Sequence, residues 1–343
     1  MTPASGPDIM NLMNDIPENS GPRYRLGQSD TWLSPIGLGT WQFSQGQGMV
    51  GKFWPRLAPA LMMSIVEEAL RHGINWFDTA EVYGKGKSEE ALADALEAFG
   101  ASPENALIAT KWWPVMRSAG NLSRTIDERL RRLHGRRITL YQIHQPYSRS
   151  SISQQMEAMA RLIDAGHIQH AGVSNFSVAQ MTEAHRALKS HGHALVSNQV
   201  RYHLLDRRIE DNGLLSKAEE LGISIIAYSP LAQGILTGKF HEPGTSVSGM
   251  RRMDPHFRPS ALKGSEPLIA ALKAMAGKYH VTPGQVALNW LITTPGDRVF
   301  AIPGATRVSQ AAQNGGAMGW RLSESDRDAL SAVSREVLKS RSR

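Results

Sequence analysis

Residues 74–111 have the sequence INWFDTAEVYGKGKSEEALADALEAFGASPENALIATK, and the expected architecture follows from this stretch. It begins with a short apolar run, 74–77, continues with a helical pattern, 87–99, and ends with a second apolar run, 106–109. Short apolar runs that alternate with amphipathic helices predict parallel strands buried on both faces. A strand, a helix and a second strand form the repeating unit of an α/β protein with a parallel sheet.

The same alternation extends along most of the chain. Apolar runs predict strands at 36–38, 74–77, 106–109, 138–141, 168–173, 194–197, 223–228 and 299–302. Helical patterns cover 60–72, 87–99, 124–134, 152–165, 177–190, 211–221 and 307–316, with further ones at 283–293 and 323–339. Ser123, Ser151 and Ser177 are candidate N-caps. Eight such units without a dividing linker favour a closed (β/α)8 TIM barrel over two doubly wound domains.

The ends of the chain and two long loops complete the expected organisation. Residues 1–22 are expected to form a mobile N-terminal extension, and 23–343 a single barrel domain with a small hairpin at 23–33 and additional C-terminal helices. Irregular stretches at 42–57 and 230–263 follow the first and seventh strands. Loops that follow the strands of such a barrel form its catalytic face, so both stretches are expected to be functional.

The composition excludes several classes of protein. Of 343 residues, 41% are hydrophobic and 20% are charged, which is a globular balance and excludes global disorder. The chain has no cysteine, which excludes disulfides, zinc–thiolate sites and a cysteine nucleophile. This composition fits a reducing compartment, and we expect a cytoplasmic protein. No apolar run is long enough for a transmembrane helix, and no metal site is expected.

The formal net charge of +7 raises the question of a nucleic-acid partner. The densest basic cluster is Arg129, Arg131, Arg132, Arg136 and Arg137. Lys and Arg in a last helical turn complement the helix dipole, so we interpret this cluster as a solvated helix end. No known nucleic-acid-binding pattern is present. We therefore expect neither a nucleic acid nor a membrane as partner, and the sequence slightly favours a monomer without deciding the oligomeric state.

Several familiar motifs are present only in part. The segment 46–51 matches G-x-G-x-x-G but lacks the preceding strand and following helix that a dinucleotide fingerprint needs. The segment 86–88 resembles the end of a P-loop, but Glu81 stands where the first glycine should be. Histidines at 167, 170, 191 and 193 are better explained as exposed or capping residues than as metal ligands. The motif G-x-S-x-G is absent.

Four polar residues at successive strand ends form the strongest candidate site. Asp78 and Tyr83 follow the strand 74–77, Lys111 ends the next strand, and His144 follows the fourth. Because strand ends of a barrel converge, these side chains should lie close together. A lysine beside a tyrosine lowers the pKa of the phenol from about 10, an aspartate holds the lysine, and a histidine orients a substrate oxygen. This set predicts a general acid that protonates an oxygen as a hydride reaches carbon.

The segment 73–84, GINWFDTAEVYG, followed by Ser88-Glu89, resembles the signature of the aldo-keto reductases. The segments around Lys111 and His144 match the next two motifs of that family in order and spacing. The resemblance extends from about residue 33 to 316 and implies a (β/α)8 barrel without a Rossmann fold. It also implies that Tyr83 is the general acid/base, with Lys111 lowering its pKa, Asp78 paired to Lys111, and His144 orienting the carbonyl.

The resemblance further implies NADP(H) as the cofactor. The expected contacts are Gly39, Thr40, Trp41, Asp78, Ser174, Asn175, Gln199, Tyr228, Ser229, Leu231, Gln233, Gly234, Lys239, Ile302, Gly304, Thr306, Arg307, Gln310, Gln313 and Asn314. Many family members carry a lysine where Gly304 stands, so Arg307 is the cation expected to bind the 2′-phosphate. An arginine there can also be a solvated residue of a first helical turn.

Within this set, different residues match different parts of the cofactor. Ser174, Asn175 and Gln199 match the residues that hydrogen-bond the nicotinamide carboxamide. Tyr228 matches the aromatic residue on which the nicotinamide ring stacks, although it is also explained as a half-buried tyrosine at a strand end. The segment 229–239 resembles the belt that crosses the pyrophosphate.

Aromatic residues in the loops after the strands predict the substrate pocket. Trp41, Phe53, Trp54, Tyr83, Trp112 and His144 are the expected substrate contacts, and Trp113 and Tyr202 are further candidates for the rim. They favour an apolar or aromatic small-molecule carbonyl compound. Cations for an acidic substrate could come only from Arg201, Arg207 or Arg208.

The residues leave three functions open. The leading one is an NADP(H)-dependent oxidoreductase that reduces aldehydes or ketones to alcohols. The second is an NADP(H)-binding regulatory or redox-sensing subunit, similar to the potassium-channel β subunits. The third is a phosphate-binding barrel isomerase or aldolase, which would not bind a nicotinamide cofactor.

Overall fold

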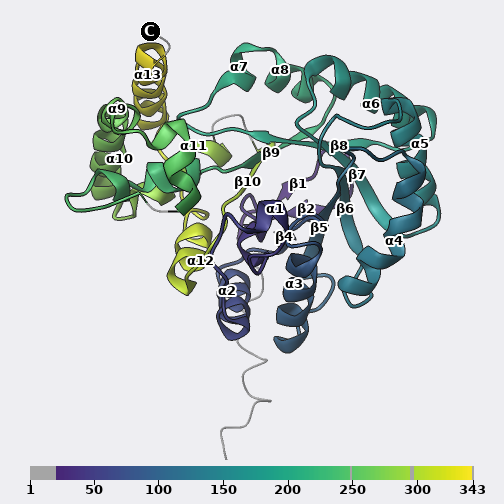
Figure 1. The fold of residues 1–343 in the computed structure, drawn as a ribbon. Coiled ribbons are helices and arrows are strands. Elements are labelled where there is room, and N and C mark those ends of the chain that lie inside the picture. Colours follow the sequence, from purple (N-terminus) through teal and green to yellow (C-terminus); the bar gives the residue numbers. More distant parts are fainter. Residues whose placement is uncertain (1–20, 248, 294–296, 342–343) are drawn as a thin grey trace, which may run out of the picture.

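The computed structural model describes residues 21–247, 249–293 and 297–341 and contains an eight-stranded parallel sheet that closes almost completely (Figure 1). The strands are β3 (Leu38–Gly39), β4 (Trp76–Asp78), β5 (Leu107–Trp112), β6 (Ile138–Ile143), β7 (Ile168–Ser174), β8 (Leu195–Arg201), β9 (Ser224–Tyr228) and β10 (Val299–Ile302). Parallel bridges join Ile36 to Ala301 and Gly39 to Gly304, between the first and last strands of the sheet. The expected (β/α)8 barrel is therefore confirmed.

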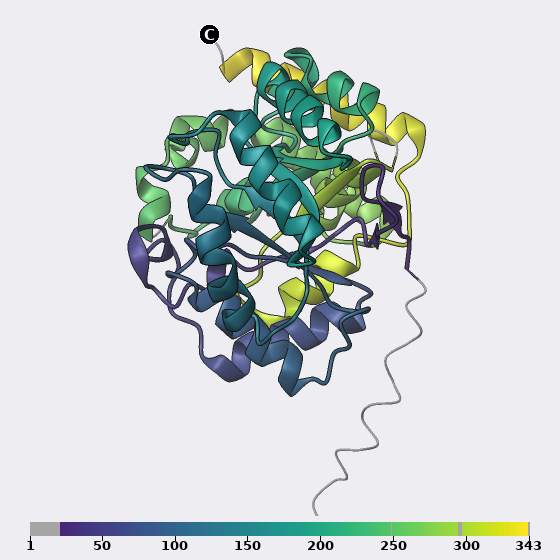
Figure 2. The same ribbon diagram turned by 90° about the vertical axis from the view of Figure 1, so that its right-hand side faces the viewer.

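Helices surround this sheet (Figures 1 and 2). They are α2 (Pro59–Arg71), α3 (Lys87–Ala98), α4 (Gly120–Arg132), α5 (Ile152–Asp164), α6 (Val178–Ser190), α8 (Leu214–Glu220), α10 (Glu266–Tyr279), α11 (Pro283–Thr293), α12 (Val308–Gly315) and α13 (Glu324–Arg341), with short helices α1 (Gly48–Gly51), α7 (Arg208–Asp211) and α9 (Pro259–Lys263). Within the described ranges, no helix has the length and apolar character needed to cross a membrane.

Two of the three serines expected as helix N-caps have this role in the structure. Ser151 and Ser177 form capping boxes at the starts of α5 and α6, as expected. Ser123 was wrongly expected as an N-cap, because α4 begins at Gly120 and Ser123 lies inside it. Helix α10 was not expected, although its buried residues Leu268, Ile269 and Leu272 have helical spacing.

An N-terminal hairpin closes the barrel at the end opposite α1 (Figure 2). Strands β1 (Tyr24–Arg25) and β2 (Trp32–Leu33) pair antiparallel, which confirms the hairpin expected at 23–33. Of the extension expected at 1–22, residues 1–20 lie outside the described part of the chain. The hairpin contributes Tyr24, Leu26 and Leu33 to the apolar core inside the barrel.

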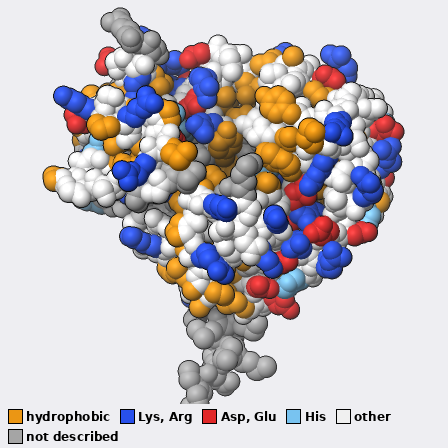
Figure 3. All heavy atoms as spheres, viewed as in Figure 1, with side chains coloured by type: hydrophobic (Ala, Val, Ile, Leu, Met, Phe, Trp, Pro, Cys, Tyr) orange, Lys and Arg blue, Asp and Glu red, His pale blue; other side chains and the backbone are white. Residues whose placement is uncertain are grey.

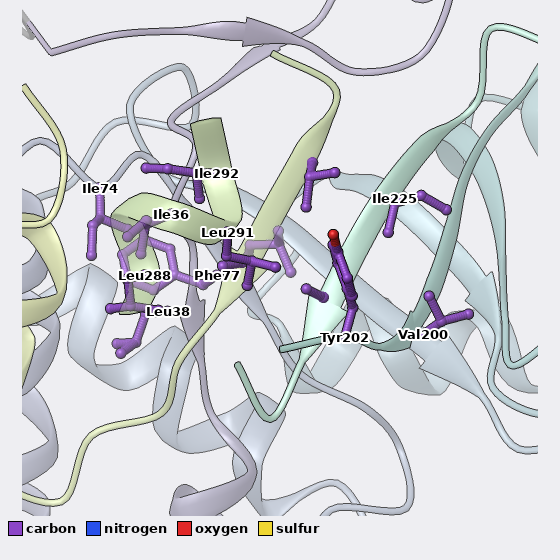
Figure 4. Packing of buried hydrophobic residues seen from close by; sticks show 14 of the residues in the cluster. Ile36, Leu38, Ile74, Phe77, Val200, Tyr202, Ile225, Leu288, Leu291 and Ile292 are labelled. Carbon is purple, nitrogen blue, oxygen red and sulfur yellow. The ribbon is translucent and has the colours of Figure 1, made fainter. Parts of the chain in front are cut away.

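The alternation of side chains along each strand separates two cores. Inward-facing Trp76, Ala109 and Ile226 pack on the hairpin residues inside the barrel. Side chains on the other face pack between the strands and the helices; Figure 4 shows part of this outer core, including Phe77 and Leu288. Because successive strand residues point to opposite faces, the inward position that follows Trp76 is Asp78, and the one that follows Ala109 is Lys111. The inward-facing side chains are therefore apolar in the middle of the barrel and polar at the carboxyl ends of β4 and β5.

Candidate active site

The four residues singled out from the sequence lie together at this end of the barrel. Lys111 Nζ is 2.5 Å from Asp78 Oδ2 and 5.1 Å from the centre of the Tyr83 ring. The Tyr83 and His144 rings are 5.7 Å apart and nearly perpendicular. Adjacent parallel strands β4, β5 and β6 bring the three segments side by side.

The Asp78–Lys111 ion pair is almost fully buried and has further hydrogen bonds. The other carboxylate oxygen, Oδ1, accepts from Gln199 Nε2 at 2.9 Å and from Gln142 Nε2 at 3.4 Å. Lys111 also donates to the backbone oxygen of Thr79 at 2.8 Å. A buried ion pair needs such additional partners to offset the loss of hydration. Gln142 was missed in the sequence, although it lies two residues before His144 and therefore faces the same side of its strand.

Burial controls the protonation of the site. It raises the pKa of the Tyr83 phenol well above its ordinary value, and the Asp78 charge raises it further. Burial and then the Lys111 charge lower the pKa of His144, while burial also lowers the pKa of Lys111 against the opposing effect of Asp78. Lys111 lies 5.1 Å from the centre of the Tyr83 ring, and its expected effect on the pKa of this phenol stays a prediction. At neutral pH, Tyr83 carries its proton and His144 is neutral, so Tyr83 can act as a donor.

Aromatic residues surround Tyr83 and His144. The Trp41 ring stacks against Phe53 at 4.9 Å and lies 6.2 Å from the Tyr83 ring. Trp54 meets the Trp41 ring edge-on at 5.8 Å. Figure 3, drawn from the same side as Figure 1, shows hydrophobic side chains gathered around the middle of this face. The first long loop thus contributes one wall of an apolar site, as expected for the stretch after the first strand.

Two residues expected at the rim lie elsewhere. The Trp112 side chain is fully buried in the outer core and donates to Asn121 Oδ1 at 2.9 Å, because it faces away from Lys111 on β5. Its neighbour Trp113 lies at the site instead, with its ring 5.2 Å from that of His144. Tyr202 is also buried in the outer core (Figure 4) and donates to Glu210.

The arginines also differ from expectation. Arg207 pairs with Glu210 and packs on the Trp290 ring, and Arg208 pairs with Asp206, so these guanidinium groups are engaged by the protein itself. Arg201 lies with its guanidinium carbon 5.7 Å from the centre of the Tyr228 ring.

The interpretation of the basic cluster as a solvated helix end is wrong for Arg129. Only 3% of its side chain is exposed, and it pairs with Glu89 at 2.9 Å and with Glu128 at 3.0 Å. Glu89 comes from α3, which packs against α4, so the pairing depends on a contact between helices that the sequence of α4 does not contain.

Residues expected to bind the nicotinamide lie at the ends of β7, β8 and β9. Ser174 Oγ donates to the backbone oxygen of Gln199 at 2.9 Å, and Tyr228 donates to Asn175 Oδ1 at 3.1 Å. Asn175 has a left-handed backbone with φ of 61°. Gln199 is hydrogen-bonded to Asp78, so this group of residues is continuous with the ion pair.

The turn after β9 has an unusual backbone. Ser229, Ala232, Gln233 and Gly234 all have positive φ, and three of them are not glycine. Such conformations cost about 1 to 3 kcal/mol each and cluster at functional sites. Successive residues with positive and negative φ can also direct their N–H groups at an anion. Within the turn, the N–H groups of Ala232 and Gly234 donate to Ser229 and Leu231 carbonyls, so any anion would have to be bound by the remaining N–H groups.

Three cations lie near this turn. Burial and then the charges of Arg251 and Arg307 lower the pKa of Lys239, which places the three groups within electrostatic reach of each other. Arg307 is the N-cap residue of α12, where the helix dipole favours anions. Arg251 was missed in the sequence, because an irregular loop carries no periodic signal. Its guanidinium lies over the Trp54 ring at 4.9 Å and connects the two long loops.

Unsatisfied polar atoms test whether these residues fit a dinucleotide. Gln42 Oε1, Gln233 Oε1 and Asn314 Nδ2 are buried without a hydrogen-bond partner among the described residues. Buried polar atoms normally have partners, so such groups indicate a missing one. Gln233 and Asn314 belong to the expected cofactor set, and Gln42 follows Trp41 directly. A polar ligand beside these residues could supply the partners of these three atoms, which are among several unpartnered buried atoms of the described residues.

Comparisons with known proteins agree with the fold and the motifs. The model of the aldo/keto reductase family matches residues 35–335. An oxidoreductase of Mycobacterium tuberculosis is 42% identical over 307 residues, which cover 88% of this chain and 90% of the relative. The chloroplastic pyridoxal reductase of Arabidopsis thaliana is 32% identical over 323 residues, which cover 90% of this chain and 85% of the relative. An aldo/keto reductase from Klebsiella pneumoniae, solved with NADP and acetate, is 25% identical with a TM-score of 0.70, covering 92% of this chain and 95% of that one.

Proposed function

The chain belongs to the aldo-keto reductase family, and from this premise we propose that it is an NADP(H)-dependent enzyme that reduces aldehydes or ketones to alcohols. The observation that carries the proposal is the buried Lys111–Asp78 pair beside Tyr83 and His144. A proton donor, a neutral hydrogen-bonding ring and a buried ammonium are the groups that carbonyl reduction requires.

Each residue of this set has a distinct role in the proposed reaction. NADPH, when bound, supplies a hydride for the carbonyl carbon. Tyr83 donates its phenolic proton to the carbonyl oxygen, which becomes the hydroxyl of the alcohol. The Lys111 ammonium stabilises the phenolate that remains, and Asp78 holds Lys111 in place. The neutral His144 imidazole orients the carbonyl oxygen toward Tyr83.

The proposed cofactor site extends from the barrel mouth to α12. Ser174, Asn175 and Gln199 would bind the carboxamide, and Tyr228 would stack on the nicotinamide ring. The positive-φ turn after β9 would bind the pyrophosphate through its N–H groups. Lys239, Arg251 and Arg307 would neutralise the phosphates, with Arg307 at the 2′-phosphate. The Klebsiella pneumoniae structure, which contains NADP, supports this cofactor.

The aromatic rim supports an apolar or aromatic carbonyl compound as the substrate. Trp41, Phe53, Trp54 and Trp113 supply flat apolar surfaces around Tyr83 and His144. The pyridoxal reductase among the relatives is named for an aromatic aldehyde, which fits this rim.

A panel of carbonyl compounds tested with NADPH and with NADH is the experiment that decides the function. We expect NADPH-dependent reduction of aromatic aldehydes such as 4-nitrobenzaldehyde, measured by loss of absorbance of the reduced cofactor. NADPH binding without turnover of any compound would favour the regulatory or sensing subunit. Absence of any binding in a tryptophan-fluorescence titration would refute a nicotinamide-dependent function of either kind.

A further inference from the structure

Glu81 has a buried carboxylate between Asp78 and Tyr83 in the loop after β4, and 8% of its side chain is exposed. Its Oε1 accepts the backbone N–H of Trp113 at 2.5 Å and a guanidinium N–H of Arg117 at 2.7 Å. Its Oε2 lies 3.7 Å from the guanidinium of Arg129. One carboxylate thus accepts two hydrogen bonds from the loop after β5 and lies beside a buried guanidinium of α4.

These contacts connect three loops of the proposed active site. The loop after β4 carries Tyr83 as well as Glu81, and the loop after β5 carries Trp113 and Arg117. The backbone oxygen of Arg117 accepts the Ser148 hydroxyl and the Arg149 N–H, each at 2.9 Å, from the segment that follows His144. Glu81 therefore lies where the loops with the proton donor, the aromatic wall and the histidine meet.

The anchor of this connection lies inside the protein. Arg129 is buried and pairs with Glu89, which is itself fully buried and accepts the Thr110 hydroxyl at 2.7 Å. Since Thr110 precedes Lys111 on β5, the network reaches the strand that carries the active-site lysine. Arg129 is itself buried, so a displacement of Glu81 would cost this guanidinium one of its carboxylate neighbours.

We propose that Glu81 is a positioning residue that holds the Trp113 loop against His144 and thereby sets the shape of the substrate pocket for large carbonyl compounds. The Glu81 carboxylate accepts the backbone N–H of Trp113, and the ring of the same residue lies edge-on to His144. A large aromatic substrate contacts this wall, whereas a small aldehyde reaches Tyr83 and His144 without it. The inference rests on the proposed function, because it concerns the pocket of the same reaction.

The variant Glu81→Leu tests the proposal. Leucine keeps much of the bulk of the side chain but has no acceptor, so the Trp113 N–H and the Arg117 guanidinium both lose the oxygen that they share. We expect hydrogen exchange of the 113–117 amides to become at least tenfold faster. For 2-naphthaldehyde we expect kcat/KM to fall about tenfold, mainly through a higher KM, with less than about a twofold change for propanal.

Two further variants make the experiment specific. Glu67→Gln removes a carboxylate that pairs with Arg71 within α2, outside these contacts, and should change neither exchange nor the ratio of the two substrates. In a Trp113→Ala background, Glu81→Leu should no longer change the substrate ratio, because the wall that Glu81 positions is absent.

The outcomes separate this inference from the proposed function. Unchanged exchange at 113–117 in Glu81→Leu would overturn the inference, as would an equal loss for both aldehydes. If the unaltered protein reduces neither aldehyde, the proposed function fails, and the positioning of a pocket for large substrates fails with it. In that case, faster exchange would still assign Glu81 a role in holding the loop but not in catalysis.

Discussion

Asparagine at position 78 would keep the shape of the side chain and remove its charge. The Asp78 carboxylate accepts from Lys111 on one oxygen and from Gln199 on the other, at 2.5 and 2.9 Å. An asparagine amide has one acceptor and one donor end, so either orientation turns an NH2 group against a donor. Asp78→Asn therefore breaks a buried ion pair. It also places the asparagine NH2 group against an N–H donor of Lys111 or Gln199.

The burial of Lys111 determines how much unfolding free energy the Asp78→Asn variant should lose. Lys111 is fully buried, and removing one partner of a buried pair costs about 3 to 5 kcal/mol of unfolding free energy. The loss should depend on pH, because burial already lowers the pKa of Lys111 and Asp78 opposes that effect. Without Asp78 the pKa falls further, so the folded variant holds a neutral lysine while the unfolded chain still binds the proton. The stability of the variant relative to the unaltered protein should then rise with pH.

Urea unfolding followed by tryptophan fluorescence at pH 6 and pH 9 measures this effect. We expect Asp78→Asn to lose at least about 3 kcal/mol at pH 6 and less at pH 9. The double variant Asp78→Asn/Lys111→Met should recover part of the loss, because methionine buries no amine that has to give up a proton or lose a partner on folding. A loss below about 1 kcal/mol at pH 6, or the same loss at both pH values, would refute the reasoning about this pair.

Two other substitutions test the phosphate end and the buried network. Arg307→Ala should weaken NADPH binding about tenfold or more and leave NADH almost unchanged, as measured by fluorescence titration; equal effects on both cofactors would contradict the assignment of Arg307 to the 2′-phosphate. Burial raises the pKa of Glu89 from 4.5 to about 7. Between these two values the folded state keeps a proton that the unfolded chain has lost. The stability that this proton contributes at low pH is lost as the pH rises through 7, by about 2 kcal/mol between pH 5.5 and pH 8. Glu89→Gln should remove that component of the pH dependence in urea unfolding, and an unchanged dependence would show that Glu89 is ionised throughout this range.

The barrel and its central residues were predictable because their signals are local. Apolar runs bounded by helical patterns mark each strand, and convergence of strand ends follows from the fold itself. Asp78, Tyr83, Lys111 and His144 could thus be grouped before any coordinates were known. The same alternation would also have placed Gln142 inward, had it been applied to β6.

The errors have a common physical cause. Trp112 differs from Lys111 by one position and therefore faces the other side of β5, and Tyr202 likewise packs outward, so aromatic character alone could not locate either. Arg129 is buried because α3 and the Tyr83 loop supply Glu89 and Glu81, contacts that no local pattern contains. Arg251 reaches Trp54 across two long loops whose paths sequence periodicity cannot predict. The cofactor contacts, the cytoplasmic location and the oligomeric state remain predictions.

A single substitution, Tyr83→Phe, tests the central claim most directly. The measurement is single-turnover oxidation of prebound NADPH by an aromatic aldehyde, together with the Kd for NADPH. We predict that the rate of reduction falls at least a hundredfold, while the Kd for NADPH changes by less than about twofold, because phenylalanine removes only the proton donor. A variant that binds NADPH and reduces the aldehyde at nearly the original rate would contradict the claim that Tyr83 is the general acid.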